Sequence, residues 1–239
     1  MAYVLDELDR DLMRAPSTGD GAAVGPLAST SEDPPDDPDK QDDDDLEIEG
    51  SDGDDHIVGG RGQDQLHGAK GDDDISGGDA HDALNGNAGN DTVSGGDGDD
   101  WVLGGKDDDV LHGDAGDDLV YGNIGDDSAT GDDGNDVVRG GQGNDTLDGG
   151  AGDDFISGDK GDDLLTGGAG ADTFNVFAGG GDDVITDFHA AEGDRLRIEG
   201  NVPYTVEQVD GDVVVHLTGG ASVTLQGVDL ATLPEGWIV

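Results

Sequence analysis

An apolar residue returns every nine positions over more than half of this chain. Residues 50–175 form an unbroken nine-residue repeat of fourteen copies, and position 8 of every copy is apolar while most other positions are Gly, Asp or another polar residue. A fixed short period of this kind predicts a solenoid, in which each repeat buries its apolar residue against those of its neighbours. The apolar column consists of Ile57, Leu66, Ile75, Leu84, Val93, Val102, Leu111, Val120, Ala129, Val138, Leu147, Ile156, Leu165 and Phe174.

Each repeat divides into a six-residue Gly/Asp loop and a three-residue strand. The side-chain period of two in a strand points position 8 inward and positions 7 and 9 outward. Two repeats complete one coil with a strand on each side, so we expect an all-β fold, a right-handed parallel β-roll of seven coils that is roughly 34 Å long. Ala129 is the smallest residue of the apolar column, and we expect a thin spot in the core there.

Two glycine columns accompany the apolar column. Position 1 is Gly in every copy, from Gly50 through Gly167, and position 4 is Gly except at Ala80 and Asp107. Glycine permits backbone angles that are closed to other residues. We therefore expect both columns to shape the loops and to leave carbonyl groups pointing out of them.

The register shifts by two residues after Asn175. Residues 178–186, AGGGDDVIT, read as a degenerate fifteenth repeat with Asp183 in position 6. The remaining residues alternate between apolar and polar, with turn signals at Asp210-Gly211 and Gly219-Gly220, which predicts a small antiparallel sheet. We assign residues 50–186 to the roll and residues 187–239 to a C-terminal antiparallel β cap that closes its open end.

The first 49 residues have a different composition. Residues 1–15 predict a short helix with three leucines on one face, which is either a docking element or a frayed terminus. Residues 16–49 are rich in Pro, Ser and acidic residues and predict an acidic disordered linker. This stretch is too short for a catalytic core, and its first residues lack the features of a cleavable secretory signal.

Charge changes the picture, because the composition alone favours disorder. The chain is 32% hydrophobic, has 46 glycines and carries a formal net charge of -49. Such a chain repels itself and buries little apolar area, and it favours cationic partners over nucleic acid or anionic membranes. It has no cysteine and no apolar run long enough for a transmembrane segment, so any stapling must be non-covalent or metallic.

Position 6 is Asp in every repeat, and this column indicates which cation could offset the charge. Repeats two apart stack, so Asp55 lies over Asp73 and Asp64 over Asp82, and stacked carboxylates repel unless a cation lies between them. Calcium accepts six to eight oxygen ligands in an irregular shell, whereas magnesium demands an octahedron and zinc prefers His or Cys. We expect calcium ligands at position 6 and at its counterpart in the fifteenth repeat: Asp55, Asp64, Asp73, Asp82, Asp91, Asp100, Asp109, Asp118, Asp127, Asp136, Asp145, Asp154, Asp163, Asp172 and Asp183.

Counting the gaps between stacked loops gives the expected number of ions. Seven loops on each side leave six gaps on each side, so we expect about twelve Ca²⁺ ions, which would reduce the net charge from -49 to about -25. Ion binding and folding should then be one event. We expect the weakest binding at the loops that depart from the pattern, with Asp107 at position 4 and with His81 and Ala171 at position 5.

The repeat reads GGxGxDxUx and resembles the RTX, or hemolysin-type, calcium-binding nonapeptide repeat over all fourteen copies. GADTFNVF, followed by DDVITDF and GDRLRI, is similar to the end region of RTX proteases and epimerases. In that family the last fifty or so residues are an uncleaved signal for type I secretion. The resemblance therefore implies a secreted, extracellular protein with an ABC exporter as partner, although Gly236 interrupts the family's typical ending. Whether Asp187 and Asp194 bind additional calcium is left open.

No catalytic motif accompanies the repeats. The chain has neither the HExxH motif of zinc proteases nor the GxSxG motif of lipases. Its six histidines are spread along the sequence, which is typical of surface residues. We therefore expect no enzyme but a secreted, calcium-folded binding or surface-associated module without catalytic activity. The alternative is an accessory module of a separately encoded extracellular epimerase, lipase or protease.

One outward-facing row is apolar. Position 7 of the even-numbered repeats reads Gln65, Ala83, Trp101, Leu119, Val137, Phe155 and Thr173, with Leu103 and Tyr121 beside it at position 9, whereas the odd-numbered repeats are mostly polar at position 7. A contiguous apolar patch usually marks an interface. We expect self-association or a protein partner through Trp101, Leu119, Val137 and Phe155, unless the N-terminal helix or the C-terminal sheet covers them.

Overall fold

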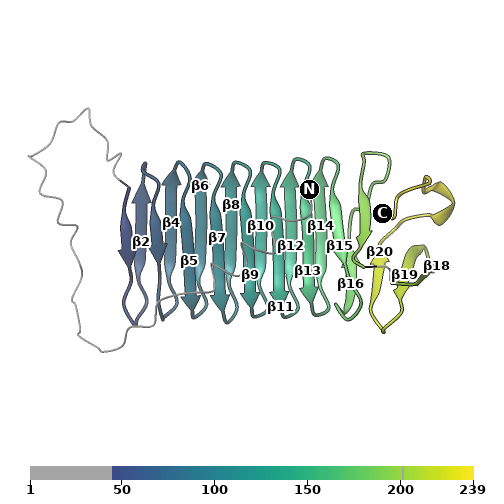
Figure 1. The fold of residues 1–239 in the computed structure, drawn as a ribbon, viewed down its shortest axis with the longest axis horizontal. Helices are drawn as coiled ribbons and strands as arrows, with labels where there is room; N and C mark the ends of the chain where they lie inside the picture. The colour runs from purple at the N-terminus through teal and green to yellow at the C-terminus, as the bar shows by residue number, and fades with distance from the viewer. Residues whose placement is uncertain (1–44, 201) are drawn as a thin grey trace, which may run out of the picture. The chain divides into compact units, whose positions relative to one another are not determined.

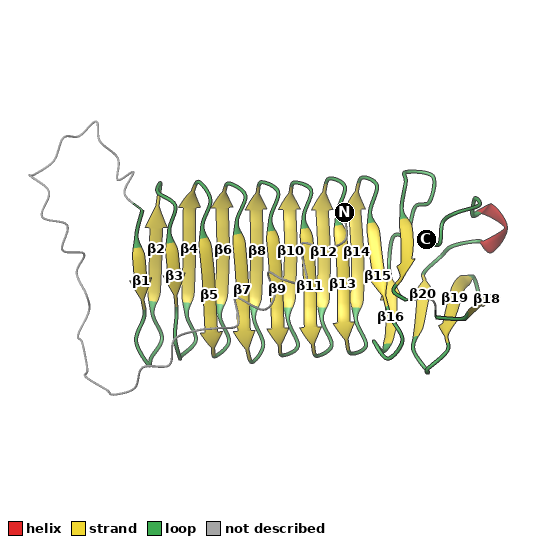
Figure 2. Cartoon of the chain, in the orientation of Figure 1, coloured by secondary structure: helices red, strands yellow, loops and turns green. Residues whose placement is uncertain are grey.

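The computed structural model describes residues 45–200 and 202–239, which form strands joined by tight turns (Figures 1 and 2). The predicted helix over residues 1–15 and nearly all of the predicted linker over residues 16–49 lie outside the described residues. Within them, one short 3-10 helix, η1 (Leu230–Thr232), follows the last strand. No helix in this part of the chain is long and apolar enough to cross a bilayer.

The strands form two sheets, and consecutive strands of the roll alternate between them. Sheet A contains nine parallel strands in the order β1 (Glu47–Glu49), β3 (Gln65–His67), β5 (Ala83–Ala88), β7 (Trp101–Lys106), β9 (Leu119–Ile124), β11 (Val137–Gln142), β13 (Phe155–Lys160), β15 (Thr173–Val176) and β17 (Arg195–Ile198). Sheet B contains eleven strands in the order β18 (Tyr204–Val209), β19 (Asp212–Leu217), β20 (Ser222–Leu225), β16 (Asp182–Ile185), β14 (Leu164–Ala169), β12 (Thr146–Ala151), β10 (Ser128–Asp133), β8 (Val110–Ala115), β6 (Thr92–Asp97), β4 (Asp74–Asp79) and β2 (His56–Gly60). The predicted parallel β-roll is thus confirmed.

Strand pairing follows the predicted eighteen-residue coil. Trp101 pairs with Leu119, and Leu119 pairs with Val137, without a slip. Most strands are six residues long rather than the predicted three, because the extended backbone continues through positions 1 to 3 of the next repeat. Positions 8 and 1 both face inward in these strands, so the glycine column lies beside the apolar column rather than in the loop.

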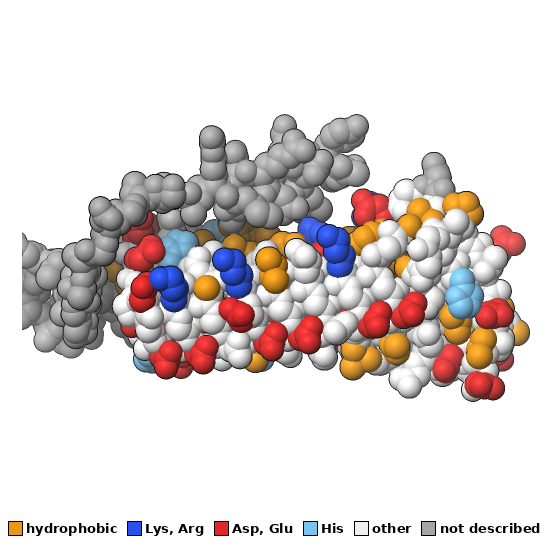
Figure 3. Space-filling model, turned by 90° about the horizontal axis from the view of Figure 1, so that it is seen from below, with side chains coloured by type: hydrophobic (Ala, Val, Ile, Leu, Met, Phe, Trp, Pro, Cys, Tyr) orange, Lys and Arg blue, Asp and Glu red, His pale blue; other side chains and the backbone are white. Residues whose placement is uncertain are grey.

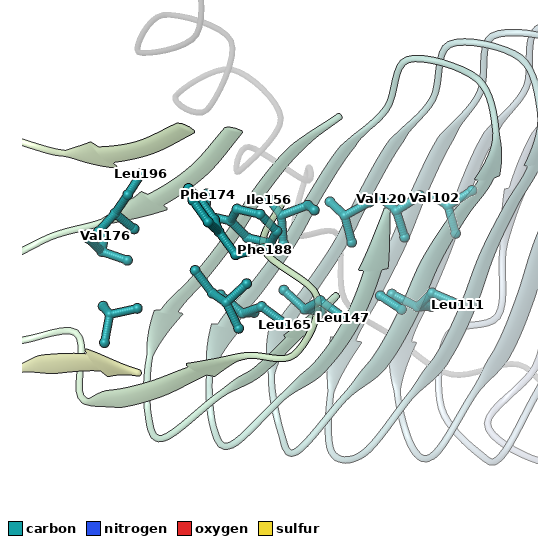
Figure 4. Close-up of a cluster of buried hydrophobic side chains, with 14 of the residues drawn as sticks. Val102, Leu111, Val120, Leu147, Ile156, Leu165, Phe174, Val176, Phe188 and Leu196 are labelled. Carbon is teal, nitrogen blue, oxygen red and sulfur yellow. The ribbon is translucent and has the colours of Figure 1, made fainter. Parts of the chain in front are cut away.

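The core is a double row of position-8 side chains, one row from each sheet (Figure 4). Every member of the predicted apolar column is buried. Ala129 is buried as well and pairs with Leu111 on one side and Leu147 on the other. The small side chain is therefore flanked by two large ones.

The roll begins earlier than the sequence predicted. Glu47, Ile48 and Glu49, which were assigned to the disordered linker, form β1 and pair with Gln65, Leu66 and His67 of β3. The prediction was wrong for these residues because it was based on their acidic composition. Ile48 occupies position 8 of a further repeat, and the two glutamates occupy the outward positions 7 and 9.

The C-terminal residues extend the roll before they close it. β16 and β17 continue sheets B and A with offsets of twenty and twenty-two residues in place of eighteen, and β20 pairs in parallel with β16. The predicted antiparallel cap follows: β19 is antiparallel to β20 and to β18, and a two-residue turn at Asp210-Gly211 with positive φ at both residues joins β18 to β19. Phe188 contacts Phe174 and Trp237 at centroid distances of 6.1 and 6.0 Å and so closes the end of the core.

Candidate functional site

The position-6 aspartates form two buried columns at the loop edges of the roll. From Asp73 to Asp172, the Oδ1 atom of each accepts a hydrogen bond from the backbone N–H of the position-6 Asp one coil earlier; for example, Asp100 N donates to Asp118 Oδ1 at 2.7 Å and Asp118 N donates to Asp136 Oδ1 at 2.8 Å. Asp64 Oδ1 accepts from Leu46 N in the same way, at 2.7 Å. One oxygen of each carboxylate therefore links two coils.

The other oxygen of these carboxylates has no partner within the chain. Thirteen Oδ2 atoms are fully buried without a hydrogen bond in the described residues, one on each position-6 aspartate from Asp64 to Asp172. A buried carboxylate oxygen without a partner costs several kcal/mol of folding free energy, roughly, unless a cation or donor reaches it. Its repetition along both edges marks two lines of places for a positive ligand.

The glycine that occupies position 1 of every repeat leaves room for the Oδ2 atom and a backbone carbonyl oxygen to approach the same space. A Cβ atom on Gly113 would lie 2.5 Å from Asp118 Oδ2 and 2.6 Å from the carbonyl oxygen of Gly131. From Gly59 to Gly167, the Oδ2 atom five residues ahead is the nearest obstacle at each position-1 glycine. The carboxylate and a backbone carbonyl thus converge on the space that the missing side chain leaves, and both are the hard oxygen donors that calcium prefers.

Glycine at position 1 is therefore required for space, not for unusual backbone angles as predicted. Positive φ occurs instead at position 2, with Asn, Asp or Ala at several copies, and at position 4. The two departures at position 4 adopt the same conformation, with φ of 89° at Ala80 and 74° at Asp107. The sequence did contain a signal for position 2, since Gly, Asn and Asp are the residues that tolerate positive φ.

Position 5 provides a second ladder that runs in the opposite direction. Here Oδ1 accepts from the backbone N–H of the next coil, as in Asp117 N to Asp99 Oδ1 at 3.0 Å and Asn135 N to Asp117 Oδ1 at 2.9 Å. Ala171 ends this ladder but still donates to Asp153 Oδ1 at 2.9 Å. Weaker calcium binding at the loops of His81, Asp107 and Ala171 stays a prediction.

Burial raises the pKa of the position-6 carboxylates, because desolvation disfavours the charged form, while the backbone N–H bond partly opposes the shift. The pKa of Asp109 rises to about 8, with Asp127 and Asp91 adding repulsion, and that of Asp118 and Asp145 rises to about 7. The pKa rises to about 6 at Asp82, Asp91, Asp127, Asp136, Asp154 and Asp172. In the folded chain without a cation, these carboxylates are therefore harder to ionise than an exposed Asp, whose ordinary pKa is 3.8.

The two end members of the predicted ligand set differ from the rest. Asp55 Oδ2 accepts hydrogen bonds from Ser51 N and Oγ at 2.6 and 2.9 Å. Asp183 occupies the position-6 place of the fifteenth repeat, where its Oδ1 accepts from Asp163 N at 3.3 Å, and burial raises its pKa to about 7. Both are in register with the columns, but neither belongs to the series of thirteen unpartnered Oδ2 atoms.

The structure also places one aspartate in the column that the predicted ligand set did not include. Asp194 Oδ1 accepts from Asp172 N at 3.1 Å, as position 6 does, but its other oxygen accepts from His189 N at 2.6 Å. The signal in the sequence was Asp194-Arg195-Leu196, which repeats the Asp-x-apolar order of positions 6 to 8. Asp187 has a different role, because its two oxygens accept from Gly167 N and Gly168 N.

No group of three or more His, Asp or Glu side chains in residues 45–200 and 202–239 comes together as a metal cluster. The oxygens that converge are instead one carboxylate and one backbone carbonyl, repeated from coil to coil.

Comparison with known proteins identifies the repeat. The chain matches the RTX calcium-binding nonapeptide repeat (4 copies) family at residues 49–84, 76–111, 94–129, 112–147, 139–174 and 148–185. No curated protein matches the chain.

Among solved structures, the extracellular lipase LipA of Serratia marcescens is similar at 21% identity and a TM-score of 0.32, over 81% of this chain and 39% of the lipase. Two subunits of the Azotobacter vinelandii mannuronan C5-epimerase are similar at 28% and 26% identity, with TM-scores of 0.31 and 0.34. They match 56% and 58% of this chain and 78% and 91% of their own lengths. The chain thus spans well under half the length of the lipase.

The close approach at position 1 predicts a cost for the smallest possible side chain. Gly113→Ala should destabilise the calcium-loaded fold by about 2 kcal/mol, because the new methyl group meets a backbone carbonyl as well as Asp118. Urea unfolding at saturating calcium measures the change. Gly53→Ala is the matched control, since nothing lies within 4 Å of its Cβ position, and an equal loss in both variants would contradict the steric argument.

The raised pKa values predict that acid favours the metal-free fold. The folded carboxylates have pKa values of about 6 to 8 against 3.8 in the unfolded chain, so the folded state binds more protons within this window. Lowering the pH from 8 towards 5 in excess chelator should therefore increase the β signal in circular dichroism. Asp109→Asn with Asp145→Asn should weaken this dependence, and a β signal that falls with acid would show that the carboxylates are not buried as described.

Proposed function

This chain belongs to the RTX calcium-binding nonapeptide repeat family, and we propose that it is a non-catalytic extracellular module that folds when calcium enters the two aspartate columns. The observation that carries the proposal is the series of thirteen buried, unpartnered Oδ2 atoms, each beside a position-1 glycine. The ligands are the fifteen aspartates predicted above, from Asp55 to Asp183, together with loop carbonyls. About twelve ions, one in each gap between stacked loops, would satisfy these oxygens and remove about half of the net negative charge.

Calcium supplies what the chain lacks in each loop, which is positive charge at the unpaired oxygen. The chain's own groups hold the site in shape: the Oδ1 bonds of positions 5 and 6 fix the spacing of the coils, and glycine at position 1 keeps the space open. Without the ion, the charged columns repel and the fold is unstable, so metal binding is coupled to folding.

This coupling supports secretion in an unfolded form. We infer a type I route with an ABC exporter, directed by residues near the C-terminus, because GADTFNVF, DDVITDF and GDRLRI resemble the end region of RTX proteases and epimerases. The calcium-poor cell interior would keep the chain threadable, and calcium outside would fold it. The alternative role is that of an accessory module for a separately encoded extracellular epimerase, lipase or protease, and both roles require a binding surface.

The apolar row of sheet A favours such a surface. Pairing stacks Trp101, Leu119, Val137 and Phe155 on adjacent strands. The four side chains are half-buried rather than fully exposed, and His81 and Arg197 lie against the rings of Trp101 and Phe155 at 5.8 Å. We propose that this row mediates self-association or binding of a protein partner.

Calcium-dependent folding is tested by titrating calcium into the chelated chain while circular dichroism is recorded. We expect the β signal to appear at roughly 0.1 to 1 mM calcium, the range of extracellular modules. Asp118→Asn should raise the calcium concentration required, because it removes a charge from the buried column. Asp117→Asn, in the exposed neighbouring position, keeps the Oδ1 acceptor and should change it little; a β signal that survives excess chelator would overturn the proposal.

The row on sheet A is tested by size-exclusion chromatography with light scattering in calcium. Trp101→Asp with Phe155→Asp should abolish the calcium-dependent oligomer and leave the β signal intact. Val110→Asp with Leu164→Asp is the control, since both residues occupy position 7 on sheet B and are 41% and 42% exposed. A wild-type chain that is monomeric in calcium and recovers no partner would retire this role.

A further inference from the structure

Six of the seven Lys and Arg residues of the described roll and its C-terminal segment lie on one side. Residues 45–200 and 202–239 contain seven Lys and Arg residues, and six of them lie on strands of sheet A or in a loop that follows one: Lys70, Lys106, Arg139, Lys160, Arg195 and Arg197. Sheet B and its loops carry Arg61 and many aspartates. In Figure 3 acidic side chains form a row along the roll, and the basic side chains gather above this row. Sheet A is therefore the side on which a ligand with acceptor groups meets donors.

A hollow of about 310 Å³ opens on this side, where the roll meets the C-terminal residues. Its floor is Gly141, which pairs with Asn123 on one strand and Asp159 on the next and has no side chain to fill the space between them. Phe177 and Glu199, which follow β15 and β17, form the opposite wall. The volume is at the lower end of the range for small-ligand sites.

One wall of the hollow is fixed in place. Arg139 donates from Nη2 and Nε to Asp159 Oδ2 at 2.8 and 3.1 Å, and its guanidinium lies 5.1 Å from the centre of the Tyr121 ring. Asp159 Oδ1 accepts from Ser157 Oγ at 2.8 Å. A ligand therefore meets a preorganised planar surface, which lowers the entropic cost of binding.

The remaining lining groups combine donors and acceptors. Lys160 contributes an ammonium group, Glu199 a carboxylate, and Asn123 and Gln142 contribute amides. A phosphate or sulfate would need donors alone and would be repelled by Glu199, and an apolar ligand would leave these groups unpaired. The hydroxyl groups of a sugar ring both donate and accept, and its C–H face can pack on Phe177.

We propose that this hollow binds one saccharide unit of a glycan, with Lys160, Gln142, Asn123 and Glu199 as its polar contacts. The hollow is lined by residues from strands of the roll and from the C-terminal segment, so it exists only in the folded chain. The inference therefore rests on the proposed calcium-dependent folding. None of the four residues of the apolar row lines the hollow: the row occupies the first position of each strand, and the lining begins at the third, with Tyr121 and Arg139.

The test is calorimetric titration of the calcium-loaded full chain with oligosaccharides of neutral hexoses and, separately, of hexuronic acids. Lys160→Ala and Gln142→Ala should each weaken binding, by about tenfold for the charged contact. Lys106→Ala is the matched control, since it is exposed at the same position of a repeat outside the hollow, and it should bind as the wild type does. Salt-sensitive binding of hexuronic acids alone assigns Lys160 to a carboxylate, and equal binding of both classes assigns it to hydroxyl groups; either supports the proposal.

Two results would overturn the saccharide site. One is the absence of binding to either class by a chain whose calcium-induced β signal is normal. The other is an equal loss of affinity in Lys106→Ala and Lys160→Ala, which would show diffuse electrostatic attraction instead of a site. The circular dichroism of every variant in calcium separates these results from a failure of calcium-dependent folding.

Discussion

The buried carboxylate of position 6 is the interaction on which the rest of this structure depends. One of its oxygens binds the preceding coil through a backbone N–H, and the other is buried without a partner. The first oxygen makes the coils stack at a fixed spacing, and the second makes the stack unfavourable on its own. The same residue thus supplies the order of the fold and its need for a cation.

Other columns of the repeat follow from this constraint. Glycine occupies position 1 because a side chain there would displace the carboxylate and the carbonyl that meet beside it. Position 5 links each coil to the next in the direction opposite to position 6, so each loop is tied to both neighbours. Position 8 adds one apolar side chain per repeat, which is little core for a domain of this size. Bound ions must therefore contribute much of the stability that a larger core supplies elsewhere.

The period of the sequence predicted the roll, the inward column and the aspartate columns, because each depends only on what repeats. The features it did not predict depend on single residues or on contacts between repeats. The extension of the strands through positions 1 to 3 follows from burial of a glycine, which composition alone assigns to a loop. The strand at Ile48 was not predicted because it lies in an acidic stretch. The place of Asp194 in the aspartate column was not predicted because it follows a change of register. The hollow could not be predicted because it depends on contacts between repeats. Gly141 pairs with Asn123 and Asp159, and the other lining residues include Phe177 and Glu199 from beyond the roll.

The offsets of twenty and twenty-two residues at β16 and β17 have a consequence for how the chain finds its alignment. Within the roll, sliding one strand by a whole coil recreates almost the same partners, so the fourteen repeats alone define many near-equivalent alignments. The altered offsets and the aromatic contacts of Phe188 occur once in the described chain and fit one alignment only. The C-terminal end therefore fixes the strand register that the repeats alone leave undefined. A roll aligned one coil out of register would lose these contacts.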